Sequence, residues 1–254
     1  MQDFADGRLR LEPGRVARLA IHAPASRNAM ARAMWGALPA IAAAVAAADS
    51  RALILSGEGG SFSAGADISE FAAIYATPET AMAANAAIRA GLAALRDLPC
   101  PVIAAVQGAC VGGGVALTLA CDQVIAAPEA FFAIPPARLG IAYSPEDTAM
   151  LLERLRPSRA KELLMSARRL SAEEALDWGL IDRIAEDPLA AASGYAATLA
   201  ELSQASIRQG KRTVNRLTEA AAQGDLAQGL AALFSGPDFL EGRSAFLERR
   251  KPRF

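Results

Sequence analysis

The stretch VIAAVQGACVGGGVALTLACDQVIA, residues 102–126, determines how this chain is built. Its first 19 residues carry only Gln107 and Thr118 as clearly polar side chains, which is long enough to resemble a membrane span. Four glycines inside those residues would break a span in lipid, where the backbone must satisfy its own hydrogen bonds. The stretch therefore predicts a buried strand at 102–106, a glycine turn, a buried helix and a further strand at 123–126.

A second glycine turn, SFSAGADI at 61–68, follows a short apolar run at 52–55. Both segments have the pattern strand, glycine turn, helix, and Gly65 lies 48 residues before Gly113, which suits successive turns of a ββα spiral. A glycine turn that enters a helix exposes backbone N–H groups without partners inside the helix. Two such turns facing each other would direct two N–H donors at one oxyanion. The simpler interpretation is that each glycine only permits a tight turn.

The rest of the sequence predicts an α/β fold with mostly parallel strands, because strands and helices alternate before an all-helical tail. Apolar runs predict two more strands, at 15–21 and 131–134. The predicted helices run from Ser26 to Ala48 with a kink or end at Pro39, from Pro78 to Arg96, from Ser171 to Gly179, and from Pro188 onward with breaks near Gly210, Gly224 and 235–237. We therefore expect a core at 1–187 and a helical C-terminal region at 188–254.

Composition excludes several classes of function. The 254 residues are 53% hydrophobic and 21% charged with a net charge of −1, which indicates a folded protein and no nucleic-acid partner. Three cysteines and one histidine have no metal-ligand spacing, so we expect no metal site, and only His22 could serve a Ser-His-Asp triad. The polar opening MQDFADGRLRLE lacks the apolar core of a signal peptide. We therefore expect a cytoplasmic protein.

In this order, SFSAGADI and GACVGGG strongly resemble the crotonase superfamily, the enoyl-CoA hydratase/isomerase family. The resemblance covers most of the chain and includes HAPASRNAM at 22–30, ARLGI at 137–141, AKELL at 160–164, ALDWGLID at 175–182 and SAFLERRKPRF at 244–254. It implies a crotonase-like ββα spiral core that binds acyl-CoA. It also implies that the helical C-terminal extension serves oligomerisation, in a homotrimer or a dimer of trimers.

The resemblance also implies where acyl-CoA binds. The N–H groups of Ala66 and Gly113 match the family's oxyanion hole for the thioester carbonyl. Coenzyme A, as part of the substrate, is the only cofactor implied. Its nucleotide end is expected against six residues that match the family's pattern: Arg27, Ala64, Asp67, Ile68, Phe246 and Arg249. The last two often come from a neighbouring subunit in such proteins.

Two of these positions have equally simple structural explanations. Arginine suits phosphate recognition, but Arg249 also fits a solvated helix end, where basic side chains are favoured by the helix dipole. Asp67 is better explained as a hydrogen-bond acceptor at a helix start than as a catalyst.

The sequence departs from the family's hydratases at the two glutamates that handle water. Those positions are Ala116 and Pro136 here, and neither side chain can transfer a proton. Because hydration needs a base for the water and an acid for the α carbon, standard two-glutamate hydration is not expected. The nearest ionisable group is YSPED at 143–147, in which Tyr143 matches a tyrosine of methylmalonyl-CoA decarboxylase and Glu146 matches the region of isomerase carboxylates. Glu146 and Asp147 also suit a helix start capped by Ser144.

The sequence thus leaves two classes of function open. The first is a lyase or isomerase that acts on acyl-CoA through a stabilised enolate, with enoyl-CoA isomerisation and methylmalonyl-CoA decarboxylation as alternatives. The second is a catalytically weak acyl-CoA-binding protein that keeps the oxyanion hole without an acid/base pair. Thioester hydrolysis is a more remote alternative, because it needs a carboxylate that directs water.

Overall fold

The computed structural model describes residues 1–218 and 237–250, without the side chains of 237–239. In this part of the chain, a seven-stranded sheet has the order β1 (Gln2–Phe4), β2 (Leu9–Glu12), β3 (Val16–Ile21), β4 (Ala52–Gly57), β5 (Val102–Val106), β7 (Gln123–Ala126) and β10 (Arg183–Ile184). A three-stranded sheet has the order β6 (Ala109–Val111), β8 (Phe131–Ala133) and β9 (Leu170–Ser171).

Strand pairing confirms the α/β class with mostly parallel strands. The main sheet is parallel from β3 through β10, and β1 and β2 add an antiparallel edge. The register aligns Leu53 with Val102, and Ile103 with Gln123. Parallel neighbours need crossover connections, and these carry the helices that cover the sheet.

The central strands are buried on both faces, which explains their unbroken apolar sequences. Leu53 and Leu55 of β4 belong to the main core, which they share with α1 (Arg32–Ala47). Ala52 and Ile54 point to the opposite face and pack in a second cluster with α8 (Pro188–Ala200). Successive strand residues thus serve two cores.

The other helices alternate with the strands or follow them. They are α2 (Phe71–Ile74), α3 (Pro78–Arg96), α4 (Gly113–Leu119), α5 (Pro145–Arg154), α6 (Pro157–Ser166), α7 (Ala172–Trp178), α9 (Gln204–Thr218) and α11 (Pro237–Leu247). The predicted bounds of α3 are confirmed, with Thr77 as its N-cap. The predicted capping box of Ser171 and Glu174 is also confirmed at α7, which ends at a left-handed Gly179.

Two predictions about helices were wrong, as was one of the two alternatives for Pro39, that the helix ends there; a kink at Pro39 stays a prediction. Helix α1 begins at Arg32 instead of Ser26, because Arg27 and Asn28 have φ angles of 52° and 58°, which no α-helix accommodates. The same helix continues through Pro39 to Ala47, so the proline does not end it. Helix α9 likewise continues through Gly210.

The predicted breaks at Gly224, 235 and 236 lie outside the described residues, and residue 237 opens α11. Five short strands were not predicted: β1, β2, β6, β9 and β10. The strands β6, β9 and β10 have only two or three residues each, too few for a periodic pattern. They depend on tertiary pairing.

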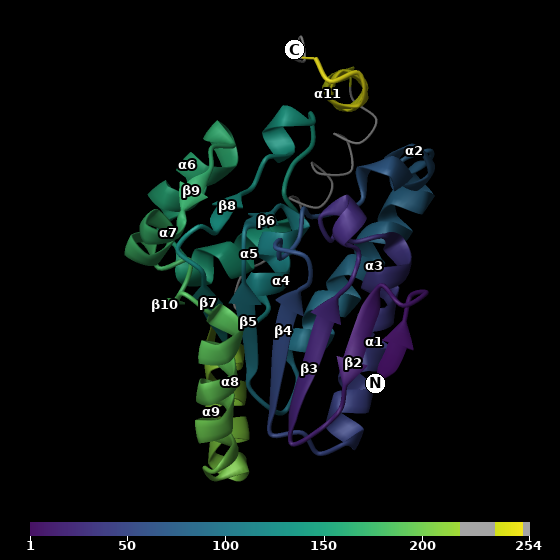
Figure 1. Ribbon diagram of the computed structural model, residues 1–254. Helices are drawn as coiled ribbons and strands as arrows, with labels where there is room; N and C mark the ends of the chain where they lie inside the picture. Colours follow the sequence, from purple (N-terminus) through teal and green to yellow (C-terminus); the bar gives the residue numbers. More distant parts are fainter. Residues whose placement is uncertain (219–236, 251–254) are drawn as a thin grey trace.

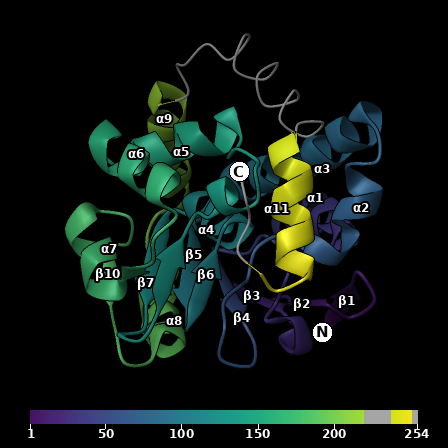
Figure 2. The same ribbon diagram turned by 90° about the horizontal axis from the view of Figure 1, so that it is seen from above.

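The parallel strands place their carboxyl ends at one end of the molecule. Figure 1 shows the arrowheads of β3, β4 and β5 pointing to the end where α4, α2 and α11 lie. Seen from that end in Figure 2, α11 lies across the molecule between α5 and α3. In open α/β sheets, ligands bind beyond the carboxyl ends of the strands, so this end is where a site is expected.

The helices after residue 187 differ in what they contact. Helix α8 packs on the sheet, and α9 is tied to the core by Lys211, whose Nζ lies 2.7 Å from Oδ2 of Asp122 and 3.1 Å from the carbonyl oxygen of Cys100. The division into 1–187 and 188–254 stays a prediction. Among the described helices, none combines the length and hydropathy of a membrane span.

Candidate functional site

A cavity of about 940 Å³ lies at the carboxyl end of the sheet. Its walls come from both glycine turns, the first half of α3, the segment from Pro135 to Asp147, and α11. The predicted or discussed positions that line it include Arg27, Ala64, Gly65, Ala66, Asp67, Ile68, Gly113, Ala116, Pro136, Tyr143, Ser144, Glu146, Asp147 and Phe246. The size falls at the upper end of the range for small-molecule sites.

Backbone hydrogen bonds join the two glycine turns directly. The N–H of Ser63 donates to the carbonyl of Ala109 at 3.0 Å, and the N–H of Val111 donates to the carbonyl of Ser63 at 2.9 Å. These bonds form an isolated parallel bridge between Ser63 and Cys110. The first turn is therefore held in register with β6, and through β6 with the second turn.

The closest approach of the turns is at Gly65, which has a φ of +92°. A methyl group on Gly65 would lie 2.6 Å from the carbonyl oxygen of Val111 and 3.1 Å from the backbone nitrogen of Gly113. Gly65 is therefore required here both for its backbone conformation and for lack of space. This contact brings the nitrogens of Ala66 and Gly113 to the same part of the cavity wall.

The N–H groups of Ala66 and Gly113 donate no hydrogen bond to any of the described residues. The residues on either side of Ala66 do form backbone hydrogen bonds. The N–H of Met30 donates to the carbonyl of Gly65 at 2.7 Å, and the N–H of Asp67 donates to the carbonyl of Met30 at 3.0 Å. Gly113 is the first residue of α4, where an N–H has no partner within the helix. The site therefore has two unused backbone donors that can stabilise one oxyanion.

Trp35 forms part of the wall beside these donors, and sequence reasoning missed it. Its indole Nε1 donates to the carbonyl of Met30 at 3.1 Å, and its side chain is buried. A methyl group on Gly113 would lie 3.0 Å from the Trp35 ring. In the sequence, Trp35 is simply one apolar residue of an alanine-rich helix, so no local signal marks it.

The segment before α1 is held against the first turn by a buried asparagine. Asn28 donates to the carbonyls of Glu58 at 2.8 Å and Ser61 at 2.7 Å, and its Oδ1 accepts from the N–H of Ala23 at 2.8 Å. The adjacent carbonyl of Arg27 accepts from the N–H of Ala64 at 2.9 Å. The exposed Arg27 side chain is thereby placed at the rim of the cavity.

Asp67 has the structural role that its sequence context suggested. Its Oδ1 accepts from the backbone N–H of Ser69 at 3.0 Å and from the Ser69 hydroxyl at 2.7 Å. It therefore caps the short turn at Ile68–Glu70, while Ala64 and Ile68 line the cavity beside it.

The positions of the family's hydratase glutamates face the cavity, as their sequence match implies. Ala116 on α4 and Pro136, in a short turn after β8, both line it. Ala116 is buried and makes the wall apolar at the point where a hydratase would have a carboxylate. Apolar walls also disfavour charge on any ionisable group nearby.

Tyr143 reaches the second glycine turn. Its hydroxyl donates to the carbonyl oxygen of Gly112 at 3.2 Å, next to the Gly113 donor. Burial raises the pKa of Tyr143 well above its usual value, and the nearby Asp147 raises it further. Tyr143 is therefore a neutral phenol at physiological pH, able to position the turn and to act as a weak acid.

Glu146 and Asp147 have different surroundings although both follow the predicted N-cap. Ser144 is confirmed as the N-cap of α5, since its Oγ accepts from the N–H of Asp147 at 2.9 Å. Glu146 forms an ion pair with Arg89 of α3 at 2.9 Å across the cavity rim. Asp147 is 8% exposed, and its Oδ1 has no hydrogen-bond partner in the described part of the chain. Burial raises its pKa from 3.8 to about 6, with a further contribution from Glu146, partly offset by the Ser144 hydroxyl.

The C-terminal helix contributes to the cavity of its own chain. Phe246 and Leu247 of α11 line it, although each is more than half exposed. Gly242 allows this packing, because a methyl group there would lie 2.5 Å from the carbonyl oxygen of Leu139. Arg249 has a φ of 54°, is exposed, and does not line the cavity. Phe246 was expected at the site, but its distance in sequence from the other site residues gives no indication that it lines the cavity of its own chain.

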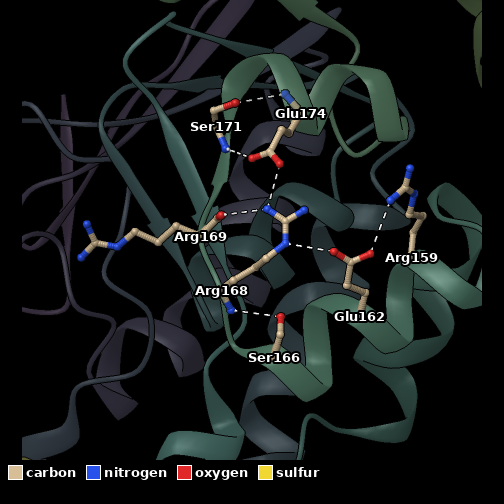
Figure 3. Close-up of polar contacts among 7 residues, drawn as sticks. All are labelled: Arg159, Glu162, Ser166, Arg168, Arg169, Ser171 and Glu174. Carbon is tan, nitrogen blue, oxygen red and sulfur yellow. Dashed lines mark hydrogen bonds and ion pairs between the residues drawn. The ribbon is translucent and has the colours of Figure 1, made fainter.

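A basic side chain that sequence reasoning missed lies on the opposite wall. Arg169 stacks on Phe131, with its guanidinium carbon 4.4 Å from the ring centre, and both line the cavity. Figure 3 shows Arg168 between Glu162 and Glu174, while the Arg169 guanidinium points away from this cluster. The Arg168 contacts to Glu162, Glu174 and the carbonyl of Arg169 measure 3.1, 2.8 and 3.3 Å. The cluster thus holds the backbone from which Arg169 extends.

Comparison with known proteins places these features in one family. Residues 12–254 match the enoyl-CoA hydratase/isomerase family. The chain is 33% identical over 245 residues to a Bacillus subtilis (strain 168) protein named "Probable enoyl-CoA hydratase", which covers 94% of this chain and 95% of the relative. A solved structure of an enoyl-CoA hydratase/isomerase family protein from Hyphomonas neptunium is 39% identical, with a TM-score of 0.81 over 97% of both chains. Methylmalonyl-CoA decarboxylase in complex with 2-nitronate-propionyl-CoA is 25% identical, with a TM-score of 0.88 over 97% of this chain and 98% of that one.

Gly65→Ala should lower the free energy of unfolding by at least about 2 kcal/mol, because it adds a positive-φ side chain and a clash with Val111. Gly36→Ala is the matched control, since Gly36 lies inside α1 with no atom within 4 Å of its added methyl group. The control should gain about 1 kcal/mol from helix propensity. Urea unfolding followed by circular dichroism measures both. Equal stability of the two variants would contradict the close approach of the turns.

Asp147→Asn should stabilise the chain at alkaline pH. Because the pKa of Asp147 is higher in the folded chain, the contribution of this group to stability is fully present below pH 3.8 and is lost as pH rises through about 6. At pH 8 the variant should therefore unfold with a free energy on the order of 3 kcal/mol higher than the wild type, and at pH 3.8 the two should converge. Urea titrations at both pH values test this. The exposed Asp177→Asn should show no such pH-dependent gain.

Proposed function

Because the chain belongs to the enoyl-CoA hydratase/isomerase family, we propose that it binds an acyl-CoA thioester and stabilises the enolate of its acyl group. The observation that carries this proposal is the pair of unused N–H donors, of Ala66 and Gly113, on the wall of one cavity. Two fixed backbone donors would stabilise the negative charge that develops on a thioester oxygen. The cavity volume suits an acyl group together with the pantetheine arm.

Standard hydration is not the reaction that this cavity favours. The two positions that would hold the water-handling carboxylates carry Ala116 and Pro136, and both face the cavity without a titratable group. General acid–base catalysis typically contributes 10²–10⁴-fold, so losing both groups should leave hydration slow. The reactions that remain proceed through an enolate, which forms either by loss of a proton from carbon or by loss of carbon dioxide and is then protonated at carbon.

Isomerisation of an enoyl-CoA is the reaction that we favour. It needs an oxyanion hole and a carboxyl group near the acyl chain, and the segment 143–147 supplies two carboxyl groups at the cavity. In such a reaction, a proton leaves one carbon, the enolate is held by the two N–H donors, and a proton returns at another carbon.

Decarboxylation of a malonyl-type thioester is the second candidate, and one observation favours it. The structurally similar methylmalonyl-CoA decarboxylase holds a coenzyme A thioester analogue. In this chain, the neutral phenol of Tyr143 lies beside the Gly113 donor. Loss of carbon dioxide would itself generate the enolate, so a hole and a weak acid suffice. A catalytically weak acyl-CoA-binding protein would share the hole but transfer no proton.

The position of the coenzyme A moiety follows from the same proposal. Its phosphates would contact Arg27 at the rim, which lies beside Ala64, Asp67 and Ile68. Phe246 would cover the entrance, and Arg249 follows Phe246 closely in the sequence. We also propose a cytoplasmic homotrimer or dimer of trimers. The exposed apolar side chains of Val214 and Leu217 on α9 support self-association, since they are 61% and 77% exposed in the single chain.

The Gly113 donor can be removed by proline, whose Cδ takes the place of the amide hydrogen. Gly113→Pro removes the N–H at the first position of α4, where proline is tolerated, whereas Gly113→Ala adds a Cβ and keeps the N–H. If Gly113 stabilises the enolate, turnover of the active thioester should fall 10²–10³-fold further in the proline variant than in the alanine variant. Steady-state kinetics with thermal unfolding as a fold check measures the difference. Equal rates would contradict the proposed hole.

A panel of thioesters should distinguish the candidate reactions. Incubation with a 3-enoyl-CoA should give the conjugated 2-enoyl-CoA, whose formation is monitored by ultraviolet absorbance. The hydration of crotonyl-CoA should be at least about 100-fold slower than this isomerisation. Methylmalonyl-CoA loses carbon dioxide only if the decarboxylase alternative holds, and mass spectrometry detects this. Rapid crotonyl-CoA hydration that survives Tyr143→Phe and Glu146→Gln would contradict the proposed roles of those residues. Failure to bind coenzyme A would contradict the proposed function.

A further inference from the structure

Among the acidic side chains on the cavity wall, Asp147 differs from the others in having a buried carboxyl oxygen without a hydrogen-bond partner in the described residues. Asp67 accepts two hydrogen bonds from Ser69, and Glu146 is paired with Arg89. Asp147 is 8% exposed, lines the cavity and has a buried Oδ1 without a hydrogen-bond partner in the described residues. A buried carboxyl oxygen of this kind costs folding free energy, so its presence calls for a functional explanation.

The helix start alone does not explain the burial of Asp147. Ser144 already caps α5 by accepting from the N–H of Asp147 at 2.9 Å. An acid in the first turn already gains a favourable interaction with the helix dipole when its carboxylate is partly solvated, as that of Glu146 is. Helix capping therefore accounts for an acid at position 147 but not for a buried, unpaired oxygen beside a cavity.

The surroundings of Asp147 favour a carboxyl group that gains and loses a proton. From its own segment it faces Tyr143 and Glu146, and Cys110 of β6 lies beyond Tyr143. Helix α4, which packs on α5, has no ionisable side chain, and Arg159 and Glu162 of the adjacent α6 are directed to Trp178 and Arg168. Since Arg89 is engaged by Glu146, none of these described groups gives Asp147 a cationic partner.

We propose that Asp147, rather than Glu146, is the acid/base residue that transfers the proton between the bound acyl group and the enolate. This inference rests on the proposed function. The Asp147 carboxylate takes a proton from an acyl carbon, so that a C–H bond breaks and an O–H bond forms on the carboxyl group. The electron pair moves to the thioester oxygen, facing the N–H groups of Ala66 and Gly113. Return of a proton from the carboxyl group to carbon, with or without prior exchange of that proton with water, restores the carboxylate, and no further reactant is consumed.

The ionisation behaviour of Asp147 agrees with this role. Its pKa of about 6 is close to neutral pH, where an acid/base group transfers protons in both directions most effectively. Tyr143 stays neutral and hydrogen-bonded to Gly112, so it serves as a positioning residue for the Gly113 turn in this scheme.

Hydrogen–deuterium exchange at the α carbon tests the inference without knowledge of the natural product. Butyryl-CoA is incubated with the full chain in D₂O, and deuterium incorporation is followed by mass spectrometry. We expect wild-type exchange to increase as pH rises through about 6 and then to level off. Asp147→Asn should reduce exchange at least about 100-fold. Butyryl-CoA affinity, measured by calorimetry, should change less than threefold.

The control is Glu153→Gln, which replaces a carboxylate by an amide on the same helix, outside the cavity wall. It should exchange at the wild-type rate. Asp147→Ser, checked for folding by circular dichroism, should repeat the loss. Exchange that persists in both Asp147 variants, or that is lost in Glu146→Gln instead, would overturn the assignment of Asp147 while leaving the enolate mechanism intact. Wild-type protein that binds butyryl-CoA without any exchange would overturn the enolate mechanism together with this inference.

Discussion

The contact between the two glycine turns is the constraint on which the rest of the site depends. The turns follow β4 and β5, which are parallel neighbours, so both emerge at the same edge of the sheet. Ser63 joins them through backbone hydrogen bonds to Ala109 and Val111, and Gly65 leaves no room for a side chain between them. The two unused N–H groups are thus fixed by the order of the strands. The proposed oxyanion hole, built this way, would need no reorganisation when charge develops.

The chemistry proposed beside the two N–H donors follows from the side chains at the two positions where a hydratase of the family has glutamates. Ala116 and Pro136 make the nearby wall apolar, and an apolar wall raises the free energy of any remaining charge. In the same cavity, burial raises the pKa of Tyr143 well above its usual value and that of Asp147 to about 6. Glu146 instead forms an ion pair with Arg89 at the rim. At the start of α5, two consecutive acidic residues thus have different surroundings: Glu146 is partly solvated and ion-paired, and Asp147 is buried.

Several walls of the cavity come from parts of the chain that are far apart in sequence. Gly242 lets α11 pack closely on Leu139, which brings Phe246 to the cavity of the same chain. On the opposite wall, the ion pairs of Arg168 hold the backbone before β9 and so fix where Arg169 lies over Phe131. Exposed ion pairs of this kind add little stability, and their value here is geometric.

The sequence by itself determined the fold class, the family and the residues of the two glycine turns. Those features are local, because a buried strand, a glycine turn and a helix start each have a recognisable pattern within about ten residues. It also marked the capped start at Ser144, and it located Ala116 and Pro136 where carboxylates would be expected. It misplaced the start of α1, since the positive φ angles of Arg27 and Asn28 depend on hydrogen bonds to the distant residues Glu58 and Ser61. Only the tertiary structure decided that Trp35 and Arg169 line the cavity. It also decided that Glu146 is ion-paired whereas Asp147 is buried. Burial and pairing depend on neighbours such as Arg89, 57 residues from Glu146, and no local pattern contains them.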